Sequence, residues 1–386
     1  MHTISHFKRR NFESLDDYSN LLAVCYFLNK IFLLEVIKSF LGHDTNVRPD
    51  IDEYVRTEMK KQKIPGLSLV IIQNNHIVYG QGYGYSNIEH KIPVTLETMF
   101  QSGSMGKQFV AMAIMILVER EDIELDTPII EYIDDAPKEW KHITVRHLLT
   151  HTAGTTDYPD DFNYREDITE DEMFELIKTI PLDFKPGKQY SYSNLGYITL
   201  GVLIHRITGE FYGDFLEKNI FQPLGMKTAR VISESDIVLN RASGYTLEDG
   251  KIKNQEWVAP SLNTFADGAL YLNMYDMVKW DTGLNSKKLL KHQTSFDEMW
   301  SSVTLNDNTT YPYGFGWEID ETVDGMHVVK HSGTWQGFET MIIRVLKAKV
   351  TVVVFANLDA ADVDEIASHL LEMYDSRLAL KSREDE

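Results

Sequence analysis

The sequence has little of three things: cysteine, basic charge, and uninterrupted apolar stretches long enough to cross a membrane. With Cys25 as its single cysteine, the 386-residue chain has neither an intrachain disulfide nor a cysteine cluster that would bind a metal. Its 38 Lys and Arg side chains stand against 58 Asp and Glu, a formal net charge of -20 at pH 7. Such a chain repels nucleic acids and anionic lipids alike, which excludes polyanion binding as the main function.

Residues 1–47 form an N-terminal extension that precedes every motif described below. Its apolar stretch, residues 21–41, follows three basic residues but contains charged side chains of its own. Charges near a bilayer centre cost roughly 2.5–3.5 kcal/mol each on insertion scales, which disfavours an uninterrupted span. A signal peptide, a membrane anchor and an amphipathic helix all stay open. We expect an extracytoplasmic location, periplasmic or secreted, rather than a cytoplasmic one, and any membrane association only through this extension.

Apolar periodicity at the two ends of the remaining chain predicts a shared sheet. A helical spacing in residues 49–64 is followed by two β-rich runs, GLSLVIIQ and HIVYGQGYGY. Near the C-terminus, FETMIIRVL and KVTVVVFAN have the composition of strands, and helical spacing follows in AADVDEIASHLLEMY. Strands at both ends with helices between them predict an α+β fold, in which one antiparallel sheet is built from both chain ends and flanked by helices.

The middle of the chain is mostly helical, and its helices are expected to begin near Ser104, Thr144, Thr169, Ser193 and Tyr275. We therefore expect one folded domain over residues 48–375, with a sheet lobe made of residues 48–103 and 310–375. A helical lobe, residues 104–309, is inserted between the two parts of the sheet. Residues 376–386 form a charged tail.

The run FQSGSMGKQFVAMAIMILVER, residues 100–120, places Ser104 and Lys107 before ten consecutive apolar side chains. A helix that is apolar on every face must be buried, and this one is shorter than the roughly 20 residues that cross a bilayer. At the helix N-terminus, burial and the helix dipole both lower the pKa of Lys107, which lies one turn from Ser104. A neutral amine there can accept the Ser104 proton, which makes Ser104 a candidate nucleophile activated without histidine. The alternative is that Ser104 only caps the helix.

Ser-x-x-Lys is too short to carry that conclusion alone, but two further elements accompany it. PGKQYSYSNLGYITLGVL contains Tyr192 and Asn194, and KHSGTWQGFETMIIR contains the triplet His331-Ser332-Gly333. Together the three elements resemble serine hydrolases related to class C β-lactamases and penicillin-binding proteins, which carry Ser-x-x-Lys, Tyr-x-Asn and then Lys-Thr-Gly or His-x-Gly. The stretches HLLTHTAG, FQPLGM and YGFGW also look like that family. The resemblance covers residues 50–373 and implies a β-lactamase/transpeptidase-like fold.

The resemblance implies a role for each motif residue. Ser104 is then the acylated nucleophile, while Lys107 and Tyr192 form a coupled pair that moves protons, with the first acceptor left open. Tyr192, beside an ammonium and a helix end, is expected to be partly phenolate. The backbone N–H groups of Ser104 and Thr334 would hold the negative charge on the attacked carbonyl oxygen. Asn194 would orient the substrate carbonyl and bond Lys107.

Side chains of the third motif are assigned to the substrate. Gly333 lets a substrate backbone approach the strand edge closely, with His331 and Ser332 beside it. Trp335 is expected to shape the acyl pocket. The expected partner is a small-molecule or peptide substrate, and neither a cofactor nor a metal is implied.

Two other features carry weaker hypotheses. His147 and His151 lie four apart, but no Glu stands between them in a metalloprotease pattern and no third ligand is evident, so a structural role is favoured over a metal site. The acidic stretch Asp157–Glu172 has the composition of a solvated loop that leads into a helix. By resemblance it lies near the rim of the cleft, where its charge would bias substrate selection.

The departure from the β-lactamase pattern lies at His331. Relatives that bind carboxylate-bearing antibiotics carry lysine there, whereas an imidazole is mostly neutral near pH 7 and holds an anion more weakly. Relatives with His-x-Gly include D-aminopeptidases and esterases, so we expect a small ester, amide or peptide substrate cleaved through an acyl-enzyme on Ser104. The alternatives are β-lactamase or D,D-peptidase activity, and a non-catalytic binding or sensor domain of the same fold.

Overall fold

The structure is a computed structural model that describes residues 48–231 and 235–381. The N-terminal extension, on which the signal, anchor and amphipathic-helix interpretations rest, lies outside the described residues. Within the part of the chain that is described, no helix is long and apolar enough to cross a membrane.

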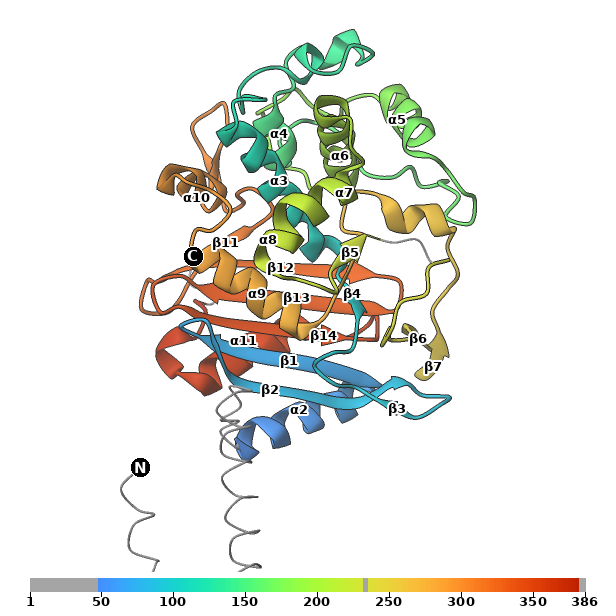
Figure 1. The fold of residues 1–386 in the computed structure, drawn as a ribbon, viewed down its shortest axis with the longest axis vertical. Helices are drawn as coiled ribbons and strands as arrows, with labels where there is room; N and C mark the ends of the chain where they lie inside the picture. The colour runs from blue at the N-terminus through green and yellow to red at the C-terminus, as the bar shows by residue number, and fades with distance from the viewer. Residues whose placement is uncertain (1–47, 232–234, 382–386) are drawn as a thin grey trace, which may run out of the picture. The chain divides into compact units, whose positions relative to one another are not determined.

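A seven-stranded antiparallel sheet organises the described chain, in the strand order β11-β12-β13-β14-β1-β2-β3 (Figure 1). In chain order, the strands are β1 (Gly66–Gln73), β2 (His76–Asn87), β3 (Ile92–Pro93), β11 (Glu318–Glu321), β12 (His327–Trp335), β13 (Phe338–Val345) and β14 (Val350–Ala356). The first strand pairs with the last, so that Leu67 lies opposite Ala356 and Gln73 opposite Val350. The prediction of an antiparallel sheet built from both chain ends is therefore confirmed.

Both faces of the central strands are buried, which is why their sequences are continuous apolar runs rather than alternating ones. Val353 and Phe355 of β14 belong to the core on the side of the inserted helices, whereas Val352 and Val354 belong to the core on the opposite side. That second core is closed by α2 (Pro49–Gln62) and α11 (Val363–Tyr374), which lie side by side on this face of the sheet (Figure 1).

The inserted segment contains the helices α3 (Lys107–Glu119), α4 (Val145–Leu149), α5 (Glu170–Thr179), α6 (Asn194–Thr208), α7 (Tyr212–Leu216), α8 (Gln222–Leu224), α9 (Met274–Asn285) and α10 (Gln293–Met299). Short 3₁₀ helices lie before or between them, namely η1 (Gly103–Gly106), η2 (Ile129–Glu131), η3 (Lys138–Trp140) and η5 (Pro260–Thr264), and another, η6 (Ser376–Leu378), follows α11. One π-helical turn, η4 (Glu217–Phe221), joins α7 to α8. Every residue of α3 from Lys107 to Leu117 is buried, as expected for a helix that is apolar on all faces.

Three of the expected helix starts are N-caps. The side chains of Thr144, Thr169 and Ser193 each accept a hydrogen bond from the backbone N–H three residues further on, at the heads of α4, α5 and α6. The expectation at Ser104 differs from the structure by three residues. Ser104 lies in the 3₁₀ turn η1, and the α-helix proper begins at Lys107.

The inserted segment and the residues at its two ends also hold short strands that the sequence did not indicate. β4 (Phe100–Gln101), β5 (Arg230–Val231) and β8 (Leu270–Leu272) form one small sheet. β6 (Tyr245–Glu248) pairs with β7 (Lys251–Asn254), and β9 (Val303–Thr304) pairs with β10 (Thr310–Tyr311). Pairing of β4 with β8 brings the chain around residue 268 against the turn that carries Ser104.

Candidate active site

Ser104 is presented by a turn that is packed tightly against β12. A β-carbon added at Gly333 would lie 2.0 Å from the carbonyl oxygen of Ser102, and one added at Gly103 would lie 2.6 Å from the backbone nitrogen of Thr334. Gly103 also has φ of +52°, a conformation that side chains with a β-carbon rarely adopt. Only glycine fits at these two positions, so the backbones of η1 and β12 approach each other directly.

Lys107 lies at the centre of the hydrogen bonds around Ser104. Its Nζ donates to Ser104 Oγ at 3.0 Å and to Asn194 Oδ1 at 2.7 Å, and a third short bond goes to the carbonyl of Asp267. The side chain is fully buried. Burial lowers the pKa of Lys107 to about 8, although the carboxylates of Asp267 and Asp157 oppose the shift. With this pKa, roughly a tenth of the amine is neutral at pH 7.

Two carboxylates stand near this lysine without bonding it directly. Asp157 accepts hydrogen bonds from Nδ2 of Asn194 at 3.1 and 3.0 Å, which fixes the amide so that its oxygen faces Lys107. Asp267 accepts a bond from the Tyr158 hydroxyl at 3.0 Å. Burial raises the pKa of Asp267, while the positive charge of Lys107 opposes the shift.

Tyr192 lies against Lys107, whose Nζ is 5.0 Å from the centre of the phenol ring. Its hydroxyl is buried and has no hydrogen-bond partner within the described chain. Burial raises the pKa of Tyr192 well above its usual range, and the adjacent Ser104 hydroxyl opposes this. The phenolate expected from the sequence is therefore disfavoured, because a buried negative charge would lose its hydration. Burial thus favours the neutral amine of Lys107 and the neutral phenol of Tyr192.

His331 lies behind the site in a chain of hydrogen bonds. Its Nδ1 is 2.5 Å from the Ser332 carbonyl and so carries the proton, which leaves Nε2 to accept from the Tyr313 hydroxyl at 2.9 Å. Tyr313 in turn accepts from His151 Nε2 at 3.2 Å, and His151 Nδ1 accepts from the Ser193 N–H at 3.1 Å. Burial lowers the pKa of His331 to about 4 and that of His151 well below its usual range. Both imidazoles are therefore neutral.

One member of this hydrogen-bonded chain, His151, also packs against Tyr192. The rings of His151 and Tyr192 have centres 4.1 Å apart and planes 32° apart, so the imidazole forms one wall of the tyrosine's niche. His147, four residues earlier, instead completes the capping box of α4 with Thr144. The two histidines thus have separate positioning roles: His147 caps α4, and His151 packs against Tyr192.

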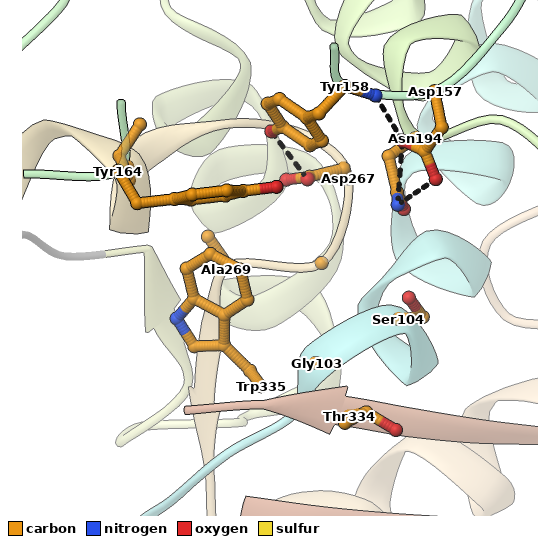
Figure 2. A pocket seen from close by; sticks show the side chains of 12 residues that line it. Gly103, Ser104, Asp157, Tyr158, Tyr164, Asn194, Asp267, Ala269, Thr334 and Trp335 are labelled. Carbon is orange, nitrogen blue, oxygen red and sulfur yellow. Dashed lines mark hydrogen bonds between the residues drawn. The ribbon is translucent and has the colours of Figure 1, made fainter. Parts of the chain in front are cut away.

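A cavity of about 300 Å³ opens above Ser104 (Figure 2). Its lining residues are Gly103, Ser104, Asp157, Tyr158, Tyr164, Asn194, Leu262, Asp267, Gly268, Ala269, Thr334 and Trp335. Figure 2 shows the rings of Tyr158, Tyr164 and Trp335 gathered on the side of Asp267, with Asn194 and Asp157 on the other side. Trp335 is held by a bond from its Nε1 to Asn263 Oδ1 at 2.6 Å.

The structure brings most of the predicted site residues together, but not all of them. Ser104, Asn194, Thr334 and Trp335 line the cavity. Lys107 and Tyr192 lie beneath it, and Gly333 is the close-contact position of β12 described above. His331 does not line the cavity, and Ser332 contributes a carbonyl to His331. The expectation that His331 touches the substrate therefore does not agree with its buried, hydrogen-bonded position.

Sequence reasoning missed several residues of the site. Asp157 and Tyr158 belong to the acidic stretch, whose composition pointed to a loop and not to individual contacts. Asp267 stands in FADGAL, where the Asp-Gly pair indicates a turn but nothing links it to Ser104. The hydrogen-bond partnership of His151 and Tyr313 spans 162 residues and has no sequence signature.

Comparisons with known proteins agree with this geometry. A sequence model of the family described as Beta-lactamase matches residues 51–372. Penicillin-binding protein 4* of Bacillus subtilis is 26% identical over 332 residues, which are 81% of this chain and 72% of that protein. Protein flp of Staphylococcus aureus is also 26% identical, and the match covers 83% of this chain and 65% of flp. A solved structure, the octameric penicillin-binding protein homologue from Pyrococcus abyssi, superposes with a TM-score of 0.75 at 26% identity, covering 85% of this chain and 77% of that one.

Proposed function

The chain belongs to the Beta-lactamase family of serine hydrolases, and we propose that it cleaves a small ester, amide or peptide substrate through an acyl-enzyme on Ser104. The observation that carries the proposal is the buried Lys107 amine, 3.0 Å from Ser104 Oγ and with its pKa lowered to about 8. A hydroxyl with a partly neutral amine as its neighbour can be deprotonated as it attacks.

We propose that acylation uses Lys107 as the proton acceptor and two backbone N–H groups as the donors to the oxyanion. The neutral Lys107 takes the Ser104 proton while Oγ forms a bond to the substrate carbonyl carbon, and the carbonyl oxygen becomes negative. The backbone N–H groups of Ser104 and Thr334 are the proposed donors to that oxygen, held in place by the contact of η1 with β12. As the bond to the leaving group breaks, the proton passes from the Lys107 ammonium to the leaving oxygen or nitrogen. Tyr192, whose buried hydroxyl has no hydrogen-bond partner among the described residues, is the proposed relay.

Deacylation uses the same groups in the reverse sense. A water molecule loses a proton to neutral Lys107, attacks the acyl carbon, and the Ser104 oxygen leaves with the returned proton. Asn194 stays fixed between Lys107 and Asp157 throughout, because its Oδ1 accepts from Lys107 and its Nδ2 donates to Asp157. The cycle therefore needs no group from outside the site except substrate and water.

The charge of the site supports an ester or peptide substrate of the D-amino-acid peptidase or esterase type over a carboxylate-bearing one. No Lys, Arg or His side chain is among the residues that line the cavity. His331, at the position where related β-lactamases carry lysine, is buried and neutral. β-Lactamase or D,D-peptidase activity is the alternative, since it would use the same nucleophile, and a non-catalytic binding domain is the third candidate.

The test is intact mass after incubation with a fluorophosphonate, followed by turnover of p-nitrophenyl esters, D-amino acid amides and a chromogenic cephalosporin. We expect one adduct, mapped to the peptide that contains Ser104 and absent in Ser104→Ala. Ser301→Ala, which changes an exposed serine, should label like the wild type. Labelling that persists in Ser104→Ala contradicts the assignment. Turnover of the cephalosporin alone would favour the alternative, and an intact fold with neither adduct nor turnover would favour a binding domain.

A further inference from the structure

The charges around the cavity do not balance. Of the described residues that line it, only Asp157 and Asp267 have charged side chains. Neither of them forms an ion pair among the described residues, and each is bonded by neutral donors instead, from Asn194 and Tyr158. One cation, Lys107, stands against two carboxylates, and even that charge is lost whenever the amine acts as a base.

Carboxylates at a partly buried surface are costly unless a positive charge compensates them. Asp267 bears this cost, which Lys107 offsets only in part, because burial raises the pKa of its carboxyl while its lysine neighbour bonds only the backbone carbonyl of the same residue. Asp157 also orients Asn194, whereas the described residues give Asp267 no cation besides Lys107. The two acidic groups therefore point to a cation that arrives with the substrate.

Aromatic rings complete the environment that an organic cation prefers. Tyr158, Tyr164 and Trp335 line the same cavity, and the first two have ring centres 5.6 Å apart. Ring faces attract ammonium groups, most strongly where water is excluded. The combination of carboxylates with aromatic faces distinguishes this cavity from a merely acidic loop, where only water would meet the carboxylates.

We infer that the acyl part of the substrate carries an ammonium group, bound between Asp157, Asp267 and the surrounding aromatic rings while Ser104 attacks the nearby carbonyl. The inference rests on the proposed function and adds the charge of the substrate to it. Three hydrogen bonds connect Asp157 to the nucleophile: Asn194 to Asp157 at 3.0 Å, Lys107 to Asn194 at 2.7 Å, and Lys107 to Ser104 at 3.0 Å. A cation at Asp157 would therefore lie close to the scissile carbonyl.

The test compares two p-nitrophenyl esters of the same shape, 4-(trimethylammonio)butanoate and 5,5-dimethylhexanoate, which differ by a charged nitrogen in place of a carbon. The charge does not titrate, so the ratio of their kcat/KM values reports the cation alone. A quaternary ammonium donates no hydrogen bond, so any preference comes from Coulombic attraction to the carboxylates and from the ring faces. A desolvated cation–π contact alone contributes up to roughly 30-fold, and we expect the wild type to favour the cationic ester by at least about tenfold. The ratio should fall severalfold in Asp157→Asn and in Asp267→Asn.

Controls separate local charge from other effects. Asp160→Asn removes the same unit charge from an exposed position of the same loop, outside the cavity, and should leave the ratio unchanged. Should an Asp variant fail to fold, Tyr164→Leu removes a ring face from a half-exposed position and should lower the ratio by a few fold. Retained fluorophosphonate labelling of Ser104 in each variant shows that the nucleophile is intact.

The outcomes distinguish this inference from the proposed function. A wild-type ratio near one with both esters turned over overturns the inference and leaves the hydrolase standing, whereas no turnover and no Ser104 adduct overturns the proposed function. If Ser104 labels but neither ester turns over, the comparison moves to labelling rates with phosphonates that carry the same two tails. Equal labelling rates, or a preference that survives both Asp variants, would also overturn the inference.

Discussion

At the scale of single residues, burying Lys107 prepares it for catalysis but lowers the stability of the fold. Its pKa falls from 10.5 to about 8 on folding, so between these pH values the unfolded chain binds a proton that the folded one has released, and below pH 8 the folded chain buries the charged ammonium. The folded state is thereby destabilised by about 3 kcal/mol, a cost fully present below pH 8 and lost as the pH rises towards 10.5. A buried methionine would avoid this cost, but it would have no proton to accept.

The same pKa predicts the pH dependence of the reaction. If neutral Lys107 is the acceptor, kcat/KM should rise about tenfold per pH unit below pH 8 and level off above it. Lys107→Ala should lower kcat by roughly 10²–10⁴ and abolish the rising limb. Tyr192→Phe should lower kcat while keeping the limb, because burial holds the pKa of Tyr192 far above this range. The measurement is a pH profile of an ester that is stable to base, from pH 6 to 9.

The opposite pattern would reverse the roles. If Tyr192→Phe removed the limb and Lys107→Ala kept it, the phenol would be the acceptor. The double variant adds a second criterion: residues that act as one unit lose less together than the product of their separate losses.

The residues of the site that the sequence predicts are those whose spacing along the chain fixes their spacing in space. Ser104 and Lys107 are one turn apart, and Tyr192 and Asn194 flank the N-cap of α6. Asp267 is different, because its place near Lys107 depends on the pairing of β8 with β4, across about 170 residues. Its role is a property of tertiary structure alone.

At the scale of elements, the site depends on one contact, between the turn η1 and the strand β12. The turn supplies Ser104 and the strand supplies Thr334, and their backbones meet where glycine replaces larger residues. A helix end and a strand brought this close have no side chains between them to adjust. Any displacement of one therefore moves the two proposed oxyanion donors apart.

Gly333→Ala tests that contact. Its β-carbon would lie 2.0 Å from the Ser102 carbonyl oxygen and 2.7 Å from the Met105 nitrogen, so β12 must move away from η1. Misplacement by about 1 Å can cost 10²-fold, and we expect kcat to fall by 10²–10³ on the best ester while the fold persists. The control is Gly209→Ala at the exposed end of α6, where φ is +70° and nothing lies within 4 Å. It should cost about 1 kcal/mol of stability without changing kcat. A folded Gly333→Ala variant with kcat within twofold of wild type would contradict the model of a tight contact.

At this scale, a helix or strand could be predicted from the sequence where it has apolar periodicity or an N-cap residue. The strands β1 and β14 and the helices that begin after Thr144, Thr169 and Ser193 have both length and boundary signals. β4, β5 and β8 have two or three residues each, too few for alternation to be visible. These short strands form because of the tertiary contacts around them. They include β4 and β8, whose pairing brings Asp267 near Lys107.

At the scale of the whole molecule, the acidic balance of the sequence acts in the same direction as the cavity. A formal charge of -20 excludes polyanions but attracts cations, and the field of a whole protein raises the local concentration of an oppositely charged substrate. The two effects differ in how salt affects them. Interactions across the surface are screened over about 30 Å at 0.01 M salt and about 3 Å at 1 M, whereas contacts inside a cavity are screened much less.

Ionic strength should therefore divide the preference for a cationic substrate into two parts. Between 0.01 and 1 M salt, kcat/KM for the trimethylammonium ester should fall by roughly two- to tenfold, while that for the neutral isostere stays nearly constant. The preference that remains at 1 M salt measures the contacts inside the cavity, and in the double Asn variant it should fall to the smaller part that the ring faces contribute. The salt-sensitive part of the preference should still be measured in the double Asn variant at low ionic strength. Removing two charges changes the formal charge only from -20 to -18, so the overall field is nearly the same. A preference that vanishes entirely at 1 M salt in the wild type would place the selection in the overall field and not in the cavity, because a local pair of carboxylates against aromatic faces would still hold the cation there.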